Sequence, residues 1–198
     1  ESIGYNIPLA VVLEGELDRR KLADAFGNSI QRHESSRTSF AMINQKPVQV
    51  IHPEVDFEIE YYDLYRTQVK VKVEENEGTR GLAPLSEETA TRNWQPVTAL
   101  INSFIRPFDL SQAPLLRVGL IKEDAKKHIL MIDMHHIISD GTSMNSFFKE
   151  LMAAYGGREL ELLQLQYKDY SEWQNKETYR VFIKKQEDYW LKLFTGDI

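Results

Sequence analysis

Cysteine is absent from this 198-residue chain, and its absence excludes disulfide bonds, thiolate metal sites and a cysteine nucleophile. Long apolar runs are also lacking, because no segment approaches the roughly 18 consecutive apolar residues that a membrane span needs. The first residues do not show the basic-then-apolar pattern of a secretory signal. These absences favour a cytoplasmic location and predict no membrane partner.

A surplus of positive charge is missing as well. Lys and Arg number 24 against 30 Asp and Glu, which gives a net charge of -6. Because phosphate binding needs clustered Lys and Arg, this balance excludes nucleic acid as an expected partner. Hydrophobic residues at 42% and charged residues at 27% are typical of a globular protein, and the length allows one domain with a sizeable core.

Hydrophobic periodicity predicts strands and helices that are interspersed along the chain. We expect strands at 7–14, 37–43, 47–52, 57–61, 115–122 and 128–135, and helices at 18–32, 97–105, 142–155, 167–173 and 177–194. Such an order predicts an α/β fold in which a mixed β-sheet is covered by helices on at least one face. Between about 67 and 100 the periodicity is lost, and we expect an inserted surface loop there.

Two adjacent histidines, His135 and His136, stand at the end of the last expected strand. Side chains alternate across a strand, so His136 shares a face with Leu130, Ile132 and Met134, and His135 shares the other with Met131 and Asp133. An imidazole at such a junction can accept or donate a proton near neutral pH, since its reference pKa is about 6.5. One histidine is therefore expected to face a cavity while the other packs in the scaffold. The alternative is that both are ordinary, partly buried residues.

Asp140 and Gly141 are expected to form the turn after this strand, because glycine tolerates positive φ and aspartate bonds the local backbone. Asp140 can hold the turn by accepting backbone amides or by pairing with an arginine from elsewhere. Gly141 either permits the turn, which we favour, or presents its amide to a reacting carbonyl. A zinc site made from these residues is disfavoured, since the two histidines point in opposite directions.

Four segments, in order, resemble motifs of condensation domains from nonribosomal peptide synthetases, within the chloramphenicol-acetyltransferase-like superfamily. Residues 135–141 read HHIISDG and resemble HHxxxDG, and residues 32–40 read RHESSRTSF and resemble RHExLRTxF. Residues 106–117 contain RPFDL and APLLR and resemble the usual approach to the histidine strand, while YKDYSEW at 167–173 resembles YxDYxxW. Four ordered motifs are more specific than HHxxxDG alone.

The resemblance implies that residues 1–198 form the N-terminal lobe of a condensation domain, one lobe of the acetyltransferase-like fold, with the second lobe absent. It implies peptide-bond formation between an acyl or peptidyl thioester and an aminoacyl thioester. Both substrates would be carried on phosphopantetheine arms, and the chain would need no cofactor or metal of its own. The expected partners are donor and acceptor peptidyl carrier domains, an adjacent adenylation domain and the missing C-terminal lobe. We expect the chain to fold alone without catalysing condensation.

The resemblance also implies a role for each motif residue. His136 maps to the histidine that meets the attacking amine, as general base or as positioning group, and His135 maps to a structural histidine. Asp140 maps to an aspartate that holds the turn through an arginine, for which we favour Arg32 over Arg37. Gly141 supports the same turn.

The chain departs from the family in two places. The SxAQxR-type opening motif is absent, and Ser36 stands where the family prefers leucine. Two other functions remain open at this point: a CoA-dependent acyltransferase of the same superfamily, and a non-catalytic module that only docks carrier domains.

Overall fold

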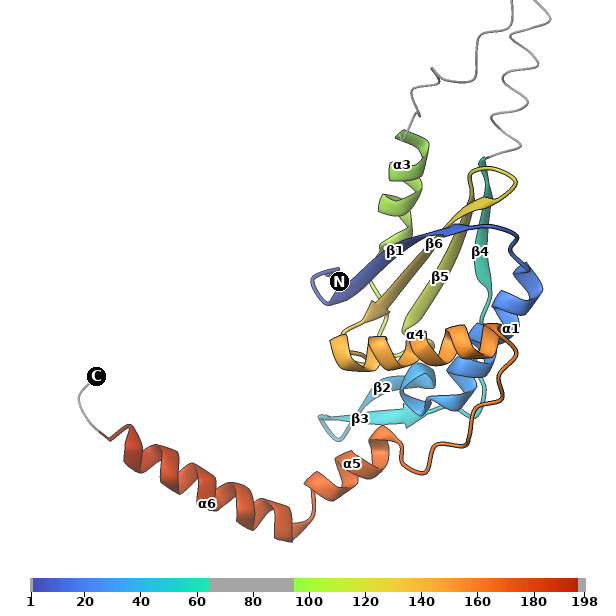
Figure 1. Cartoon of the computed structure of the whole chain (residues 1–198). Helices are drawn as coiled ribbons and strands as arrows, with labels where there is room; N and C mark the ends of the chain where they lie inside the picture. The colour runs from blue at the N-terminus through green and yellow to red at the C-terminus, as the bar shows by residue number, and fades with distance from the viewer. Residues whose placement is uncertain (1, 65–94, 196–198) are drawn as a thin grey trace, which may run out of the picture.

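A computed structural model describes residues 2–64 and 95–195 of the chain (Figure 1). In chain order its elements are β1 (Asn6–Glu14), α1 (Arg19–Arg32), the 3₁₀ helix η1 (Glu34–Arg37), β2 (Thr38–Ile43), β3 (Lys46–Ile51), β4 (Ile59–Asp63), α3 (Gln95–Phe104), β5 (Leu116–Lys122), β6 (Lys127–His135), α4 (Gly141–Tyr155), α5 (Tyr167–Gln174) and α6 (Glu177–Leu193). Most of these bounds lie within two residues of the predicted ones.

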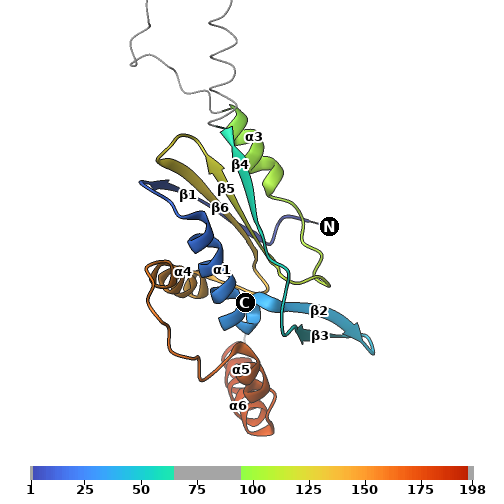
Figure 2. The same cartoon turned by 90° about the vertical axis from the view of Figure 1, so that its right-hand side faces the viewer.

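The main sheet has four strands in the order β1-β6-β5-β4. β6 pairs antiparallel with both β1 and β5, and β4 pairs parallel with β5. The predicted mixed sheet is therefore confirmed. β2 and β3 form a separate two-stranded hairpin, which lies beyond the end of this sheet and follows the end of α1 (Figures 1 and 2).

The central strand β6 is buried on both of its faces. Leu130, Ile132 and Met134 join the core that packs under α1 and α4, and Ile129 and Met131 join the core that contains Val97 and Phe104 of α3. The predicted alternation of side chains is thus confirmed. Because both faces are covered, the strand reads as an almost continuous apolar run.

The β2–β3 hairpin turns at Asn44 and Gln45, as predicted. Both residues have positive φ, 50° and 64°, which suits the right-handed twist of a two-residue hairpin. The hairpin is tied to the body at its base, where the Phe40 amide donates to the Leu110 carbonyl at 2.7 Å. This tie holds one wall of the site described below.

Two expected elements, the strand at 57–61 and the loop at 67–100, differ from the structure in their bounds. The strand expected at 57–61 is displaced to Ile59–Asp63, because its register is set by parallel pairing of Ile59 with Val118 and Asp63 with Lys122. The expected loop at 67–100 ends earlier than predicted, since α3 begins at Gln95. The rest of that loop lies outside the described residues. None of the helices in the described ranges is long and apolar enough to cross a membrane.

Helices α5 and α6, which we call the C-terminal arm, extend away from the sheet (Figure 1). Large apolar side chains along this arm are exposed, including Trp173 at 46%, Phe182 at 53% and Trp190 at 53%. Several of its aromatic rings contact each other, such as Trp173 and Tyr179 with centroids 4.4 Å apart. Apolar surface of this extent is typical of a face that another protein surface covers.

Gly119 on β5 tests how tightly α3 packs against the sheet. A Cβ at this position would lie 2.6 Å from Met131 Cε and 3.0 Å from Phe104 Cε2, and both side chains are buried. We expect Gly119→Ala to lower the free energy of unfolding by about 1–3 kcal/mol, because the core must shift. Gly27→Ala, in an exposed and open position of α1, is the control and should raise it by about 0.5–1 kcal/mol. Urea denaturation measures both, and equal effects would contradict this packing.

Candidate functional site

His136 lies just beyond the end of β6, and its exposed side chain lines a hollow of about 590 Å³. Its backbone N–H donates to the Tyr5 carbonyl at 2.8 Å, which continues the β1–β6 pairing by one residue. The walls come from η1, β2, β3, the start of α4 and the segment 163–167. Residues that line it include His33, Thr38, Phe40, Gln49, Asp140 and Gln166.

His135 points away from this hollow and packs in the scaffold. Its ring is nearly perpendicular to that of Phe108, with centroids 6.1 Å apart, and its Nδ1 accepts the Ile137 N–H at 3.0 Å. Burial, followed by the charge of His136, lowers the pKa of His135. The two histidines diverge as strand alternation predicts. Within the described ranges no cluster of three His, Cys, Asp or Glu is arranged to hold a metal.

Asp140 is the N-cap of α4 rather than the partner of an arginine. Its carboxylate accepts the Ser143 N–H at 2.7 Å and the Ser143 hydroxyl at 2.8 Å, and its own N–H donates to that hydroxyl oxygen at 2.6 Å. These hydrogen bonds from Ser143 lower the pKa of the Asp140 carboxyl. The expected pairing with Arg32 is wrong. The Asp140 carboxylate is exposed and already accepts hydrogen bonds at the helix end, so it does not need a buried counter-ion.

Gly141 is the first residue of α4, and its φ lies outside the positive range. The expectation that glycine is needed here for a left-handed turn is therefore wrong. A Cβ at this position would meet nothing within 4 Å. The space beside the Gly141 Cα is open, so a bound molecule can approach the backbone closely at this point.

Arg32 and Arg37 are bound to other partners. Arg32 Nε donates to Glu150 Oε2 at 2.9 Å, and a second nitrogen of Arg32 donates to the Glu161 carbonyl. Arg37 donates to the His52 carbonyl and lies 3.6 Å from the carboxylate of Glu34. The two arginines thus brace the corner where α1 passes into η1 and β2.

Glu150 is a residue that sequence reasoning missed. Its Oε2 also lies 2.7 Å from His33 Nε2, so one carboxylate on α4 holds two consecutive residues at the end of α1. Burial raises the pKa of Glu150, but the hydrogen bonds from Arg32 and His33 outweigh burial and the pKa is lowered overall. No local pattern marks Glu150, because its partners are distant in sequence.

Gln166 was also missed, and it fixes the wall formed by 163–167. Its side-chain amide donates to the Arg32 carbonyl at 2.9 Å and accepts the Glu34 N–H at 3.1 Å. Lys168 adds a contact of 2.7 Å to the Glu34 carboxylate. The start of α5 is thereby attached to the same corner that Glu150 holds, beside His136.

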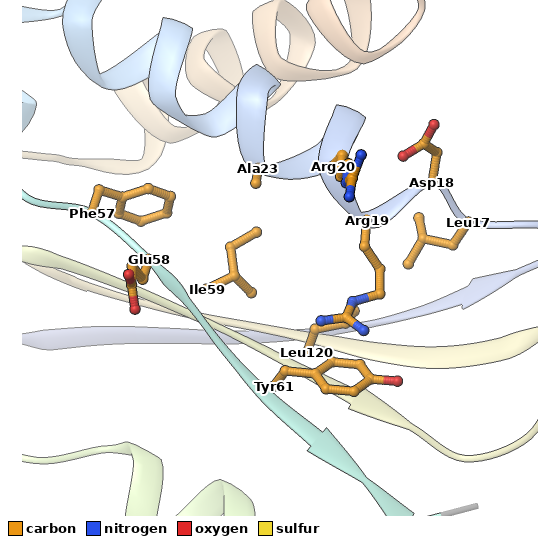
Figure 3. Close-up of a pocket in the computed structure, with 10 residues that line it drawn as sticks. All are labelled: Leu17, Asp18, Arg19, Arg20, Ala23, Phe57, Glu58, Ile59, Tyr61 and Leu120. Atoms are coloured by element: carbon orange, nitrogen blue, oxygen red, sulfur yellow. The ribbon is translucent and has the colours of Figure 1, made fainter.

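A larger hollow of about 820 Å³ lies at the other end of α1 (Figure 3). Figure 3 shows the Arg19 side chain extended over Tyr61, and the Arg19 guanidinium lies 3.5 Å from the centre of that ring. The residues that line this hollow include no histidine and none of the HHxxxDG residues. We therefore place the candidate site in the smaller hollow, where the motif residues lie.

Comparison with protein families finds one that covers the whole chain. The family model described as Condensation domain matches residues 1–198. Gramicidin S synthase 2 of Aneurinibacillus migulanus is 45% identical over 195 residues, and bacitracin synthase 1 of Bacillus licheniformis is 41% identical over 196 residues. These alignments cover 98% and 99% of this chain. The chain spans only 4% and 3% of the length of those curated relatives.

Solved structures share the fold. The X-domain in complex with OxyB from teicoplanin biosynthesis matches with a TM-score of 0.71 at 25% identity, over 98% of this chain and 39% of that chain. The starter condensation domain of rhizomide synthetase RzmA matches with a TM-score of 0.70 at 18% identity, over 99% of this chain and 44% of that chain. This chain therefore corresponds to less than half of each solved structure.

Glu150→Gln tests the brace between α4 and α1. At neutral pH we expect the free energy of unfolding to fall by about 1 kcal/mol, because two charge-assisted hydrogen bonds weaken. Because folding lowers the pKa of the Glu150 carboxyl, its ionised form stabilises the fold at pH values above the ordinary pKa of 4.5. This contribution is lost as the pH falls through the lowered pKa. The difference between the two proteins should therefore shrink in acid. Urea titrations at several pH values measure it, with exposed Glu159→Gln as the control. A difference that stays constant with pH contradicts the assignment.

Proposed function

We propose, on the premise that this chain belongs to the condensation-domain family of nonribosomal peptide synthetases, that it takes part in peptide-bond formation through His136. The substrates are an acyl or peptidyl thioester and an aminoacyl thioester, each on the phosphopantetheine arm of a carrier domain. The observation that carries the proposal is the position of His136. It is the motif histidine whose side chain lines the open hollow, whereas His135 is packed against Phe108.

The chemistry requires a group that handles one proton. The amine nitrogen attacks the thioester carbonyl carbon, the C–S bond breaks, and the thiol of the donor arm leaves. The amine needs a free lone pair at attack, and the nitrogen must shed a proton as the bond forms. An imidazole within hydrogen-bond reach can accept that proton or hold the amine in line. His136 takes this role in the proposal, and Gly141 leaves room beside it at the positive end of α4.

The walls of the hollow suit a linear substrate arm. Phe40 and Leu165 offer apolar surface, and Gln49 and Ser35 offer hydrogen-bonding groups. A phosphopantetheine arm alternates methylene and amide groups, so it can use both kinds of surface. The proposed reaction uses no metal or cofactor bound to this chain, because the reactive groups arrive on the carrier domains.

The C-terminal arm supports a second part of the proposal. Its exposed aromatic side chains offer a surface for the rest of a condensation domain, the expected C-terminal lobe. Solved structures of the same fold extend well beyond the part that this chain matches. We propose that the chain works inside a longer, cytoplasmic synthetase, beside carrier and adenylation domains, and that it does not catalyse condensation alone.

Among the competing functions, similarity favours the synthetase. The relatives at 41% and 45% identity are bacitracin synthase 1 and gramicidin S synthase 2, so a CoA-dependent acyltransferase is the weaker alternative. Product formation depends on the His136 side chain if the module is catalytic, and it does not depend on it if the module only docks carrier domains.

His136→Ala in the complete synthetase separates catalysis from docking. We expect product formation from loaded carrier domains to fall by about 10²–10⁴-fold, because the proton-handling group is removed. Carrier binding should remain unchanged. Single-turnover assays by mass spectrometry measure the rate. His52→Ala, at a histidine bound to Ser39 outside the residues that line the hollow, is the control. Unchanged product formation in His136→Ala would favour docking alone.

The exposed arm predicts that the 198-residue chain self-associates when it is produced alone. Replacing Phe182 and Trp190 by Ser should shift the chain towards monomer, because apolar contact area is lost. Sedimentation velocity over a range of concentrations measures the change. The control replaces the exposed polar residues Lys185 and Gln186 of the same helix by Ser. Equal association of all three proteins would argue against the arm as an interface.

A further inference from the structure

Asp133 is a fully buried carboxylate on β6, on the face opposite to the hollow. Its side chain is 0% exposed and accepts hydrogen bonds from Asn6 Nδ2 at 2.7 Å and Arg117 Nη1 at 2.9 Å. Burial raises the pKa of Asp133 despite these two donors. A buried charge is costly and adds little to the free energy of unfolding even when it is paired. Stability therefore does not explain why a carboxylate lies here, beside the motif.

The first donor leads to the backbone of His136. Asn6 is held between the Asp133 carboxylate and the Arg106 carbonyl, to which it donates at 3.0 Å. Asn6 directly follows Tyr5, whose carbonyl accepts the His136 N–H at 2.8 Å. Fixing Asn6 therefore fixes the acceptor that holds the peptide group before His136.

The second donor leads to the peptide group after His136. Arg117 also donates to the carbonyls of Arg106 at 2.6 Å and Pro107 at 2.7 Å, and its guanidinium lies 3.6 Å over the Phe108 ring. The Phe108 ring in turn packs nearly perpendicular to the His135 ring. His135 Nδ1 accepts the Ile137 N–H at 3.0 Å. This series of contacts thus runs from the Asp133 carboxylate to the backbone of Ile137.

We propose that Asp133 is a positioning residue for His136. Through Asn6 and Arg117 its carboxylate anchors the groups that hold both peptide units flanking the His136 Cα. Asp133 is not among the residues that line the hollow, so it acts only through the histidine. This inference rests on the proposed role of His136 in condensation. A misplacement of about 1 Å at a reacting group can cost on the order of 10²-fold in rate.

Asp133→Asn in the complete synthetase removes the charge and keeps the shape. We expect the single-turnover rate at saturating carrier domains to fall about 10- to 100-fold while carrier binding is retained. Asp24→Asn, at an exposed carboxylate on α1, is the matched control and should leave the rate unchanged. A normal rate in folded Asp133→Asn would overturn the proposal.

A double-mutant cycle separates positioning from a general effect on the fold. If Asp133 acts only through His136, Asp133→Asn should cause no further loss in a His136→Ala background. A loss of the same size in both backgrounds would reveal a general structural role and refute the inference. If His136→Ala itself keeps full activity, the proposed function fails instead, and the two failures are distinguishable.

Asn6→Ala provides a milder variant that cuts only the first of the two connections. Amide hydrogen exchange at His136 should become about tenfold faster or more, because its acceptor is less firmly held, while exchange at Leu130 in the middle of β6 stays unchanged. This readout does not depend on catalysis, so it tests the anchoring even if Asp133→Asn does not fold or His136 has no role. If amide exchange at His136 is unchanged in Asn6→Ala, the proposal is refuted.

Discussion

The central strand β6 is the constraint on which the rest of the structure depends. It is hydrogen-bonded along both edges and buried on both faces, so it has almost no freedom to shift. A residue at the end of such a strand is placed by the whole sheet. His136 directly follows this strand and its side chain is exposed in the hollow, which is the combination that the proposed proton-handling role needs.

Polar groups from three directions hold the surroundings of His136. Asp140 caps α4 in front of it, Glu150 braces the end of α1 beside it, and Asp133 anchors the strand behind it. Surface and partly buried ion pairs contribute modestly to stability. Their common effect here is geometric: Glu150 ties α4 to the end of α1, Asp133 ties β6 to its neighbours β1 and β5, and Asp140 fixes the start of α4 through Ser143. We regard them as one frame around a single exposed imidazole.

The C-terminal arm differs from the rest of the described structure in how much of its apolar surface is exposed. The sheet and helices α1, α3 and α4 bury their apolar faces in two cores, whereas α5 and α6 keep theirs exposed. Gln166 attaches the arm at its base, next to the hollow. In the proposed longer domain, a lobe that packs on this arm would therefore also be positioned relative to His136.

Local patterns in the sequence determined the elements and the divergence of the two histidines. Alternation along 128–136 is a short-range property, so it predicted correctly which face each side chain of β6 takes. Tertiary structure alone decided the ion pairs, because each pair joins residues far apart in the chain: Arg32 meets Glu150 rather than Asp140, and Asp133 meets Arg117 and Asn6. The start of α4 at Gly141 is by contrast a local feature, since Asp140 is capped to Ser143 only three residues further along, and here the expected turn was the wrong choice between two local structures. Backbone preferences act over a few residues, whereas the choice of a charge partner depends on which elements the fold brings together.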